Sequence, residues 1–109
     1  MSRNTSQRPR IVADVDADLL QRFHARVVAD GTTMREQFCA AFEAAQRDQA
    51  RLVALIADAA AQARAERRKR LTIDAEPEQV LSIKTVAFEN DVTIGALAQA
   101  LIANFCAQK

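Results

Sequence analysis

The sequence predicts a mostly α-helical fold with one two-stranded antiparallel β-ribbon, in the element order β-α-α-α-β-α-α. Two observations support this prediction: a short alternating stretch followed by two helical segments, and a second copy of that pattern elsewhere in the chain. At 109 residues, the chain has the length of one small domain. We therefore expect the two copies to share one hydrophobic core, as a pseudo-dimer within a single chain.

A strand is predicted at Arg70–Asp74. Leu71 and Ile73 alternate there with polar residues, and this period of two indicates a strand with one buried face. A lone strand leaves its backbone edges unpaired, and one small unit cannot enclose a core. The strand therefore needs a partner of the same kind.

Two helices are predicted after this strand. Glu76-Pro77 favours a helix start, because proline is preferred at the first helical position. Asn90-Asp91 ends this helix, and Thr93 is a good cap for the next one. The apolar residues of the two helices recur at a helical spacing: Val80, Ile83, Val86 and Ala87, then Ile94, Leu97, Leu101 and Phe105.

The same pattern occurs 60 residues earlier, and this internal repeat is the main organisational feature of the chain. Without a gap, Arg10–Val15 lies over Arg70–Ala75, and Asp30–Thr33 lies over Asn90–Thr93. The first strand is expected at Arg8–Val15. The helices after it have their apolar residues at Leu20, Phe23 and Val27, then at Met34, Phe38, Ala41 and Phe42.

A connecting helix is predicted between the repeats, since Ala44–Arg68 lacks glycine and proline and is rich in helix-forming residues. About 20 helical residues span roughly 30 Å, enough to return the chain to the first strand. That path needs a break near Gln46–Gln49, whereas an unbroken helix would force the strands to pair between two chains. The predicted division is a flexible arm at 1–7, repeat one at 8–46, the connecting helix at 47–68 and repeat two at 69–109.

The chain contains two units of strand, helix, turn and helix. They resemble the ribbon-helix-helix (MetJ/Arc) family of DNA-binding proteins. The strand sequence KRLTI and the threonine after the turn are especially similar to CopG-type repressors. The resemblance covers about residues 8–46 and 69–108. It implies that two antiparallel strands enter the major groove of double-stranded DNA while the helices form the core. The tandem form is similar to accessory proteins of bacterial conjugation and T-DNA transfer, through architecture alone.

By this resemblance, the outward strand side chains contact bases: Arg10, Val12, Arg70 and Thr72. Arginine can donate two hydrogen bonds to guanine, and threonine can bond a base or touch a thymine methyl group. Val12 departs from the family pattern, because it offers only apolar contact. Asp14 and Asp74 also depart: they either cap the following helices, which we favour, or accept from a cytosine amino group.

Phosphates are expected where the second helix of each repeat begins, since free N–H groups and the helix dipole favour an anion there. Gly95 is costly in a helix; either the close approach of a phosphate or a lack of constraint would explain it. The predicted phosphate contacts are Thr33, Met34, Thr93 and Ile94 at these helix ends, with Arg8, Arg67, Arg68 and Lys69 beside the strands.

Positive charge is concentrated beside the two predicted strands, although the net charge of the chain is only +1. Met1–Ala13 holds three arginines and no acid, and Arg64–Arg70 holds five basic residues and one acid. Neutralisation of phosphates supplies the sequence-independent part of DNA binding. The alternative explanation is that these basic residues only form the solvent-exposed end of a helix.

No enzyme activity, cofactor or metal site is predicted. The chain has no glycine-rich phosphate loop, and two cysteines and one histidine are too few for a metal cluster or for acid–base chemistry. Cys39 and Cys106 are expected to be buried free thiols. No apolar run is long enough for a signal peptide or a membrane span, so we expect a cytoplasmic protein.

Two other functions remain open: an antitoxin-like module whose helices bind a toxin or another partner, and a helical adaptor with incidental basic runs. Antitoxins of this fold usually carry a tail after the second helix, whereas this sequence stops at Lys109. We prefer DNA binding, as a plasmid-type transcription regulator or an accessory protein in conjugation, T-DNA transfer or partition. The expected partner is double-stranded DNA at the nucleoid or a plasmid, together with further copies of the chain or a DNA-processing complex.

Overall fold

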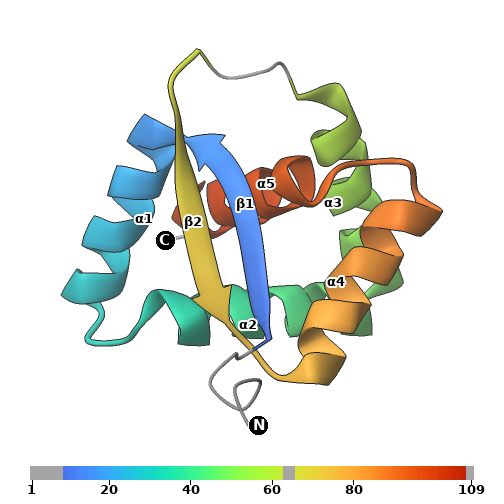
Figure 1. Ribbon diagram of the computed structural model, residues 1–109, viewed down its shortest axis with the longest axis horizontal. Helices are drawn as coiled ribbons and strands as arrows, with labels where there is room; N and C mark the ends of the chain where they lie inside the picture. Colours follow the sequence, from blue (N-terminus) through green and yellow to red (C-terminus); the bar gives the residue numbers. More distant parts are fainter. Residues whose placement is uncertain (1–8, 63–65, 108–109) are drawn as a thin grey trace, which may run out of the picture.

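The computed structural model describes residues 9–62 and 66–107 (Figure 1). The elements in these residues are β1 (Arg10–Asp16), α1 (Ala17–Ala29), α2 (Met34–Arg47), α3 (Gln49–Ala61), β2 (Arg68–Asp74), α4 (Pro77–Glu89) and α5 (Ile94–Ala107). This order confirms the predicted fold, which is mostly helical with one antiparallel ribbon. The predicted arm at 1–7 lies outside the described residues.

The two strands pair antiparallel along their whole length, within the one chain. Val12 lies opposite Thr72, and these two residues are also equivalent in the 60-residue repeat. An approximate two-fold axis therefore passes through the centre of the ribbon. Because side chains alternate between the two faces of a strand, one face of the ribbon is buried, and its residues are Ile11, Ala13, Val15, Leu71 and Ile73.

The helices keep the offset of the repeat, since α4 and α5 begin and end 60 residues after α1 and α2. The turns between the paired helices also match. Gly31 has φ of 71° and the equivalent Asp91 has φ of 57°, both in the left-handed region. Glycine adopts this conformation freely, and aspartate is among the few other residues that tolerate it. The repeat found in the sequence is therefore a repeat of backbone structure.

A break at Asp48 separates α2 from α3 and turns the chain back towards the ribbon. The Asp48 carboxylate caps α3 by accepting from the Arg51 N–H group at 3.3 Å. Aspartate is a preferred N-cap residue, so the break does have a sequence signal, which the prediction of a break near 46–49 missed. The return path within one chain is confirmed.

The segment after α3 differs from the prediction of helix as far as Arg68. α3 ends at Ala61, and β2 begins at Arg68. The strand is longer than the alternating run indicates because Arg68 and Lys69 continue the pairing, opposite Asp16 and Val15.

α5 is the central helix of the core and passes behind the ribbon (Figure 1). α1 packs against it through Leu19, Phe23 and Val27, which recur every four residues and are buried. The prediction named Leu20 in place of Leu19, and Leu20 is only partly buried. The Phe23 and Phe105 rings meet edge to face, with centroids 5.5 Å apart. The buried residues of α5 are Leu97, Ala98, Ala100, Leu101 and Ile102.

Cys39 and Cys106 are free thiols, but each is only partly buried, which corrects the prediction of full burial. The Cys39 thiol lies 3.8 Å from the Gln79 side-chain oxygen and links α2 to α4. Burial raises the pKa of both thiols above the usual cysteine value. A raised pKa lowers the thiolate fraction of both cysteines at neutral pH.

Among the described residues, no single helix has the length and apolar character needed to cross a membrane. α4 and α5 reach that standard only when taken together, across a bend of 106°.

Candidate nucleic-acid interface

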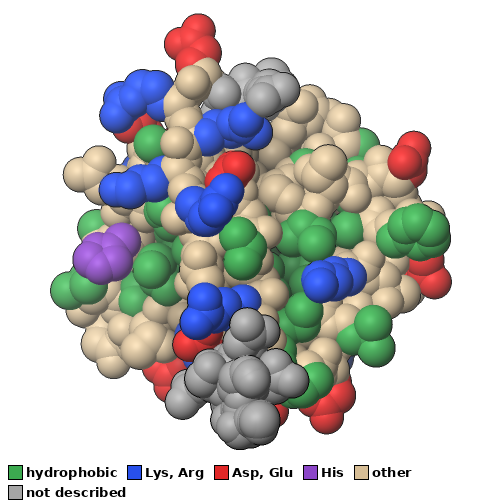
Figure 2. All heavy atoms as spheres, in the orientation of Figure 1, with side chains coloured by type: hydrophobic (Ala, Val, Ile, Leu, Met, Phe, Trp, Pro, Cys, Tyr) green, Lys and Arg blue, Asp and Glu red, His purple; other side chains and the backbone are tan. Residues whose placement is uncertain are grey.

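The outward face of the ribbon bears the four predicted base contacts, and all four are exposed: Arg10, Val12, Arg70 and Thr72. Val12 is 47% exposed although it is aliphatic. Figure 2 looks onto this face and shows Lys and Arg side chains in a row along the ribbon. Arg10 and Arg70 thus lie on opposite sides of the central Val12–Thr72 pair.

Each of these arginines forms an ion pair with an aspartate on the other strand. Arg10 Nε lies 3.4 Å from Asp74 Oδ1, and Arg70 Nε lies 3.5 Å from Asp14 Oδ1. The two pairs are related by the two-fold axis at the ribbon centre, since both flank the Val12–Thr72 pair. Exposed pairs of this kind contribute little to the stability of a fold.

These ion pairs correct the capping role that was favoured for Asp14 and Asp74. The cap of α1 is Asp16, whose Oδ2 accepts from the Leu19 N–H group at 2.9 Å. The cap of α4 is Glu76, where the backbone N–H group donates to the Gln79 side chain. The helices begin two residues too far along the chain for the earlier aspartates to reach them.

The N-terminus of α2 already holds a carboxylate. Thr33 caps the helix, and the Glu36 side chain accepts from the Thr33 N–H group at 3.2 Å and from the Thr32 hydroxyl at 2.9 Å. These hydrogen bonds, the one from Thr32 first, lower the pKa of Glu36 below its usual value. A phosphate beside Thr33 and Met34 would have to approach this negative charge, so the predicted contact is disfavoured electrostatically.

The N-terminus of α5 has no such carboxylate. Thr93 Oγ1 accepts from the Ala96 N–H group at 2.9 Å, and Ala96 stands where repeat one has Glu36. The first turn of α5 contains no acidic residue, and its Ile94 side chain is partly buried against the core. Of the two predicted helix-end sites, this one keeps the electrostatics that an anion needs.

Gly95 has a structural explanation that neither sequence hypothesis included. A Cβ atom at this position would lie 3.2 Å from the backbone oxygen of Asp14. Glycine therefore allows α5 to pack closely against β1, and the position needs no phosphate to account for it. The equivalent residue in repeat one is Arg35.

Arg35 is a basic residue at the candidate interface that the sequence prediction did not include. Its Nε donates to the backbone oxygen of Asp74 at 2.8 Å, and its Nη2 lies 3.7 Å from Glu76. The guanidinium group is thereby held at the end of β2 while its side chain stays about half exposed. Its place in the first turn of α2, beside the predicted contact Met34, is the signal that could have revealed it.

A shallow hollow of about 570 Å³ flanks the ribbon on the side of α1. Arg67, Lys69 and Met34 line it, so three predicted phosphate contacts come together there. Arg67 also lies 3.9 Å from Asp18 at the start of α1. Arg68 is exposed on the outward face of the ribbon, and Arg8 lies outside the described residues.

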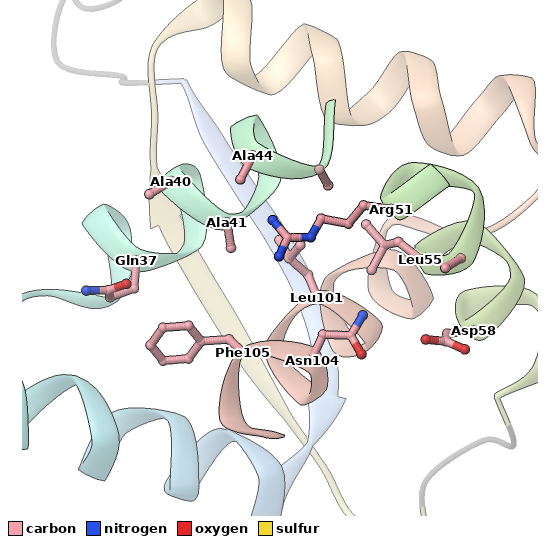
Figure 3. A pocket seen from close by; sticks show the side chains of 12 residues that line it. Gln37, Ala40, Ala41, Ala44, Arg51, Leu55, Asp58, Leu101, Asn104 and Phe105 are labelled. Atoms are coloured by element: carbon pink, nitrogen blue, oxygen red, sulfur yellow. The ribbon is translucent and has the colours of Figure 1, made fainter. Parts of the chain in front are cut away.

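A second groove of about 470 Å³ lies between α2, α3 and α5. Figure 3 views it with both strands behind the helices that form it, so it does not open onto the ribbon face. Ala41 of α2, Leu55 of α3 and Phe105 of α5 line it, and Arg51 crosses it. α3, which has no counterpart in the other repeat, forms one wall of this groove.

The described residues contain no group of three or more His, Cys, Asp or Glu side chains placed to hold a metal ion. The same residues contain no buried polar or charged side chain. No protein-family model matches the chain, and no curated protein or solved structure matches it significantly. The exposed, two-fold related ribbon is the most distinctive arrangement of polar groups in the described part of the chain.

Proposed function

We propose that this chain binds double-stranded DNA by inserting its β-ribbon into the major groove, as ribbon-helix-helix proteins do. The observation that carries the proposal is the exposed ribbon face, with two arginines related by an approximate two-fold axis. The major groove is about 12 Å wide and admits a two-stranded ribbon. A two-fold arrangement of side chains suits a duplex, because the two strands of DNA are themselves related in that way.

The proposed contacts divide by chemistry. Arg10 and Arg70 donate to guanine, while Val12 and Thr72 contact the bases at the centre of the subsite. Phosphates are bound beside the ribbon and at the start of α5, where the helix dipole is not neutralised. The proposed phosphate contacts are Arg35, Arg67, Arg68, Lys69, Thr93 and Ile94, with Arg8 from the sequence.

The proposed biological setting is that of a plasmid-type transcription regulator or an accessory protein in conjugation, T-DNA transfer or partition. It rests on the tandem arrangement of two units in one chain. In this setting the protein is cytoplasmic and bound to a plasmid or the nucleoid. Neighbouring subsites would recruit further copies of the chain or a DNA-processing complex.

A salt titration on random-sequence duplex DNA tests the proposal. Binding measured by fluorescence anisotropy should weaken steeply between about 50 and 200 mM salt, because each phosphate contact releases a counterion. Binding that is absent at low salt would reject the proposal.

A protein-interaction module of the antitoxin type is the second candidate, and exposed apolar residues on α4 favour it. Phe88 is 87% exposed and Leu81 is 66% exposed. They lie seven residues apart, hence on one side of the helix, where repeat one has Val28 and Gln21. Phe88→Ser should leave DNA binding unchanged if the ribbon is the DNA interface. Loss of DNA binding in this variant would instead place α4 in the interface.

A further inference from the structure

The aspartates of the ribbon are the feature that the proposed function does not explain. A carboxylate that faces DNA is repelled by phosphates and by the acceptor atoms of the bases. Asp14 and Asp74 nevertheless occupy equivalent positions on the outward face, each beside an arginine of the other strand. Their ion pairs are exposed, with 44% and 46% of the aspartate side chains accessible, so the stability of the fold does not require them.

We infer that each aspartate is a specificity determinant and acts with its arginine to read one G·C base pair. This inference rests on the proposed DNA binding. The major-groove edge of a G·C pair presents two acceptors, guanine N7 and O6, next to one donor, the cytosine amino group. An arginine beside an aspartate presents donors next to an acceptor, in the same order. The edge of an A·T pair has its donor between two acceptors and does not match.

The geometry of the ion pairs allows both contacts at once. In each pair the arginine meets the aspartate through Nε. A bidentate contact with guanine needs two further N–H groups, and the two Nη atoms supply them. The aspartate has a second oxygen that can accept from cytosine. It also holds the guanidinium group in place before binding, which lowers the entropy lost in the complex.

The register of the ribbon predicts where the two G·C pairs lie. Arg10 and Arg70 are each two positions from the central Val12–Thr72 pair, on opposite sides. Four positions along a strand span about 13 Å, which is the rise of about four base pairs. The subsite should therefore contain two G·C pairs in opposite orientation, about four base pairs apart. Among the four proposed base contacts only Val12 and Thr72 differ between the repeats, so base preferences should be asymmetric only at the centre of the subsite.

Selection from a random duplex pool, followed by affinity measurement on every single-base variant, tests this inference. Sites selected by the wild-type chain should contain the two inverted G·C pairs. Asp14→Asn should relax the preference at one of them or shift it towards A·T, since asparagine pairs with adenine. Asp74→Asn should do so at the other. Each should lower the ratio of specific to random-sequence affinity on the order of tenfold, while random-sequence affinity rises.

Asp18→Asn is the matched control. Asp18 also pairs with an arginine near the ribbon, Arg67, but it lies on α1 and is not on the outward face. Its removal should raise affinity for all sequences equally. If Asp14→Asn and Asp74→Asn behave in the same way, with unchanged base preferences, the inference is wrong while DNA binding stands. If the folded wild-type chain binds no duplex, the proposed function itself is wrong.

Discussion

The two repeats share their backbone structure but differ in the groups that they offer to a ligand. Both have a seven-residue strand, a 13-residue helix, a left-handed turn residue and a 14-residue helix. Both place an arginine and an aspartate outward on the strand. At the ribbon centre, however, Val12 of repeat one lies opposite Thr72 of repeat two. In the first turn of the second helix, repeat one has Glu36 where repeat two has Ala96. The two repeats therefore keep their fold and their outward arginine and aspartate, and they differ at the ribbon centre and at the start of the second helix.

The second helices of the two repeats pack differently. α3 packs beside α2 and α5 and has no counterpart after α5. α5 buries five residues, whereas the equivalent α2 buries Phe38, Phe42 and Ala45 only. The pseudo-symmetry is therefore closest at the ribbon and weakest where α3 covers the helices.

The largest expected effect concerns the two faces of one strand. Ile73→Asp should unfold the domain, because it places a charge without a partner in a small core where Ile73 is 2% exposed. Thr72→Asp should leave the domain folded, because Thr72 is on the exposed face. Far-UV circular dichroism distinguishes the two. A folded Ile73→Asp variant beside an unfolded Thr72→Asp variant would reverse the assignment of the faces.

The next effect separates Arg70, a proposed base contact, from Arg67 and Arg68, which are proposed phosphate contacts. Arg70→Ala should cost on the order of 1–3 kcal/mol of binding free energy on the specific site and relax its sequence preference. Replacement of Arg67 and Arg68 together should weaken binding to all sequences and flatten the dependence of affinity on salt. The measurement is affinity on specific and random duplexes over a salt series. Exchange of the two patterns would reject the assigned roles.

A smaller effect tests the centre of the ribbon, where the repeats differ. Val12→Thr makes the two outward strand faces alike at this position, and Val12 is exposed, so stability should change little. The wild-type chain should show unequal base preferences in the two halves at the centre of its subsite. The Val12→Thr variant should show equal base preferences in the two halves, measured by substituting each base of the subsite in turn. Unchanged asymmetry in Val12→Thr would mean that the difference arises outside the ribbon.

The smallest expected effects concern the helix ends. Ala96→Glu should weaken DNA binding by placing a carboxylate at the start of α5, and Glu36→Gln should strengthen it slightly. Because the folded-state pKa of Glu36 is lowered, its ionised form stabilises the fold at pH values above the usual glutamate pKa. This contribution is lost as pH falls through the folded-state pKa. Thermal unfolding of wild type and Glu36→Gln should differ at pH 7 and converge in acid; a constant difference would contradict this.

The fold could be predicted from the sequence because its signals are local and repeated. The alternation at Leu71 and Ile73 and the proline at position 77 mark the elements, and the repeat confirms each of them once more. The Asp48 break was placed correctly without its cap being noticed, since a single aspartate between two helical stretches is a weak signal. Leu19 was missed because it is adjacent to Leu20, and the sequence alone does not show which of the two leucines points into the core.

The candidate interface was less predictable because it depends on contacts between distant residues. The outward positions of Arg10 and Arg70 follow from alternation within a strand. Their pairing with Asp74 and Asp14 needs the register between strands, which local sequence does not supply. In the same way, the close approach of Gly95 to β1 depends on how α5 crosses the ribbon.

The central claim is that one chain provides both strands of a DNA-binding ribbon. The most direct test is the mass of the complex with a duplex that holds one selected subsite, measured by light scattering coupled to gel filtration. The account predicts one chain per duplex, and a free protein of one chain mass. Two chains bound together on a perfectly palindromic site, from a free protein of twice the chain mass, would contradict it.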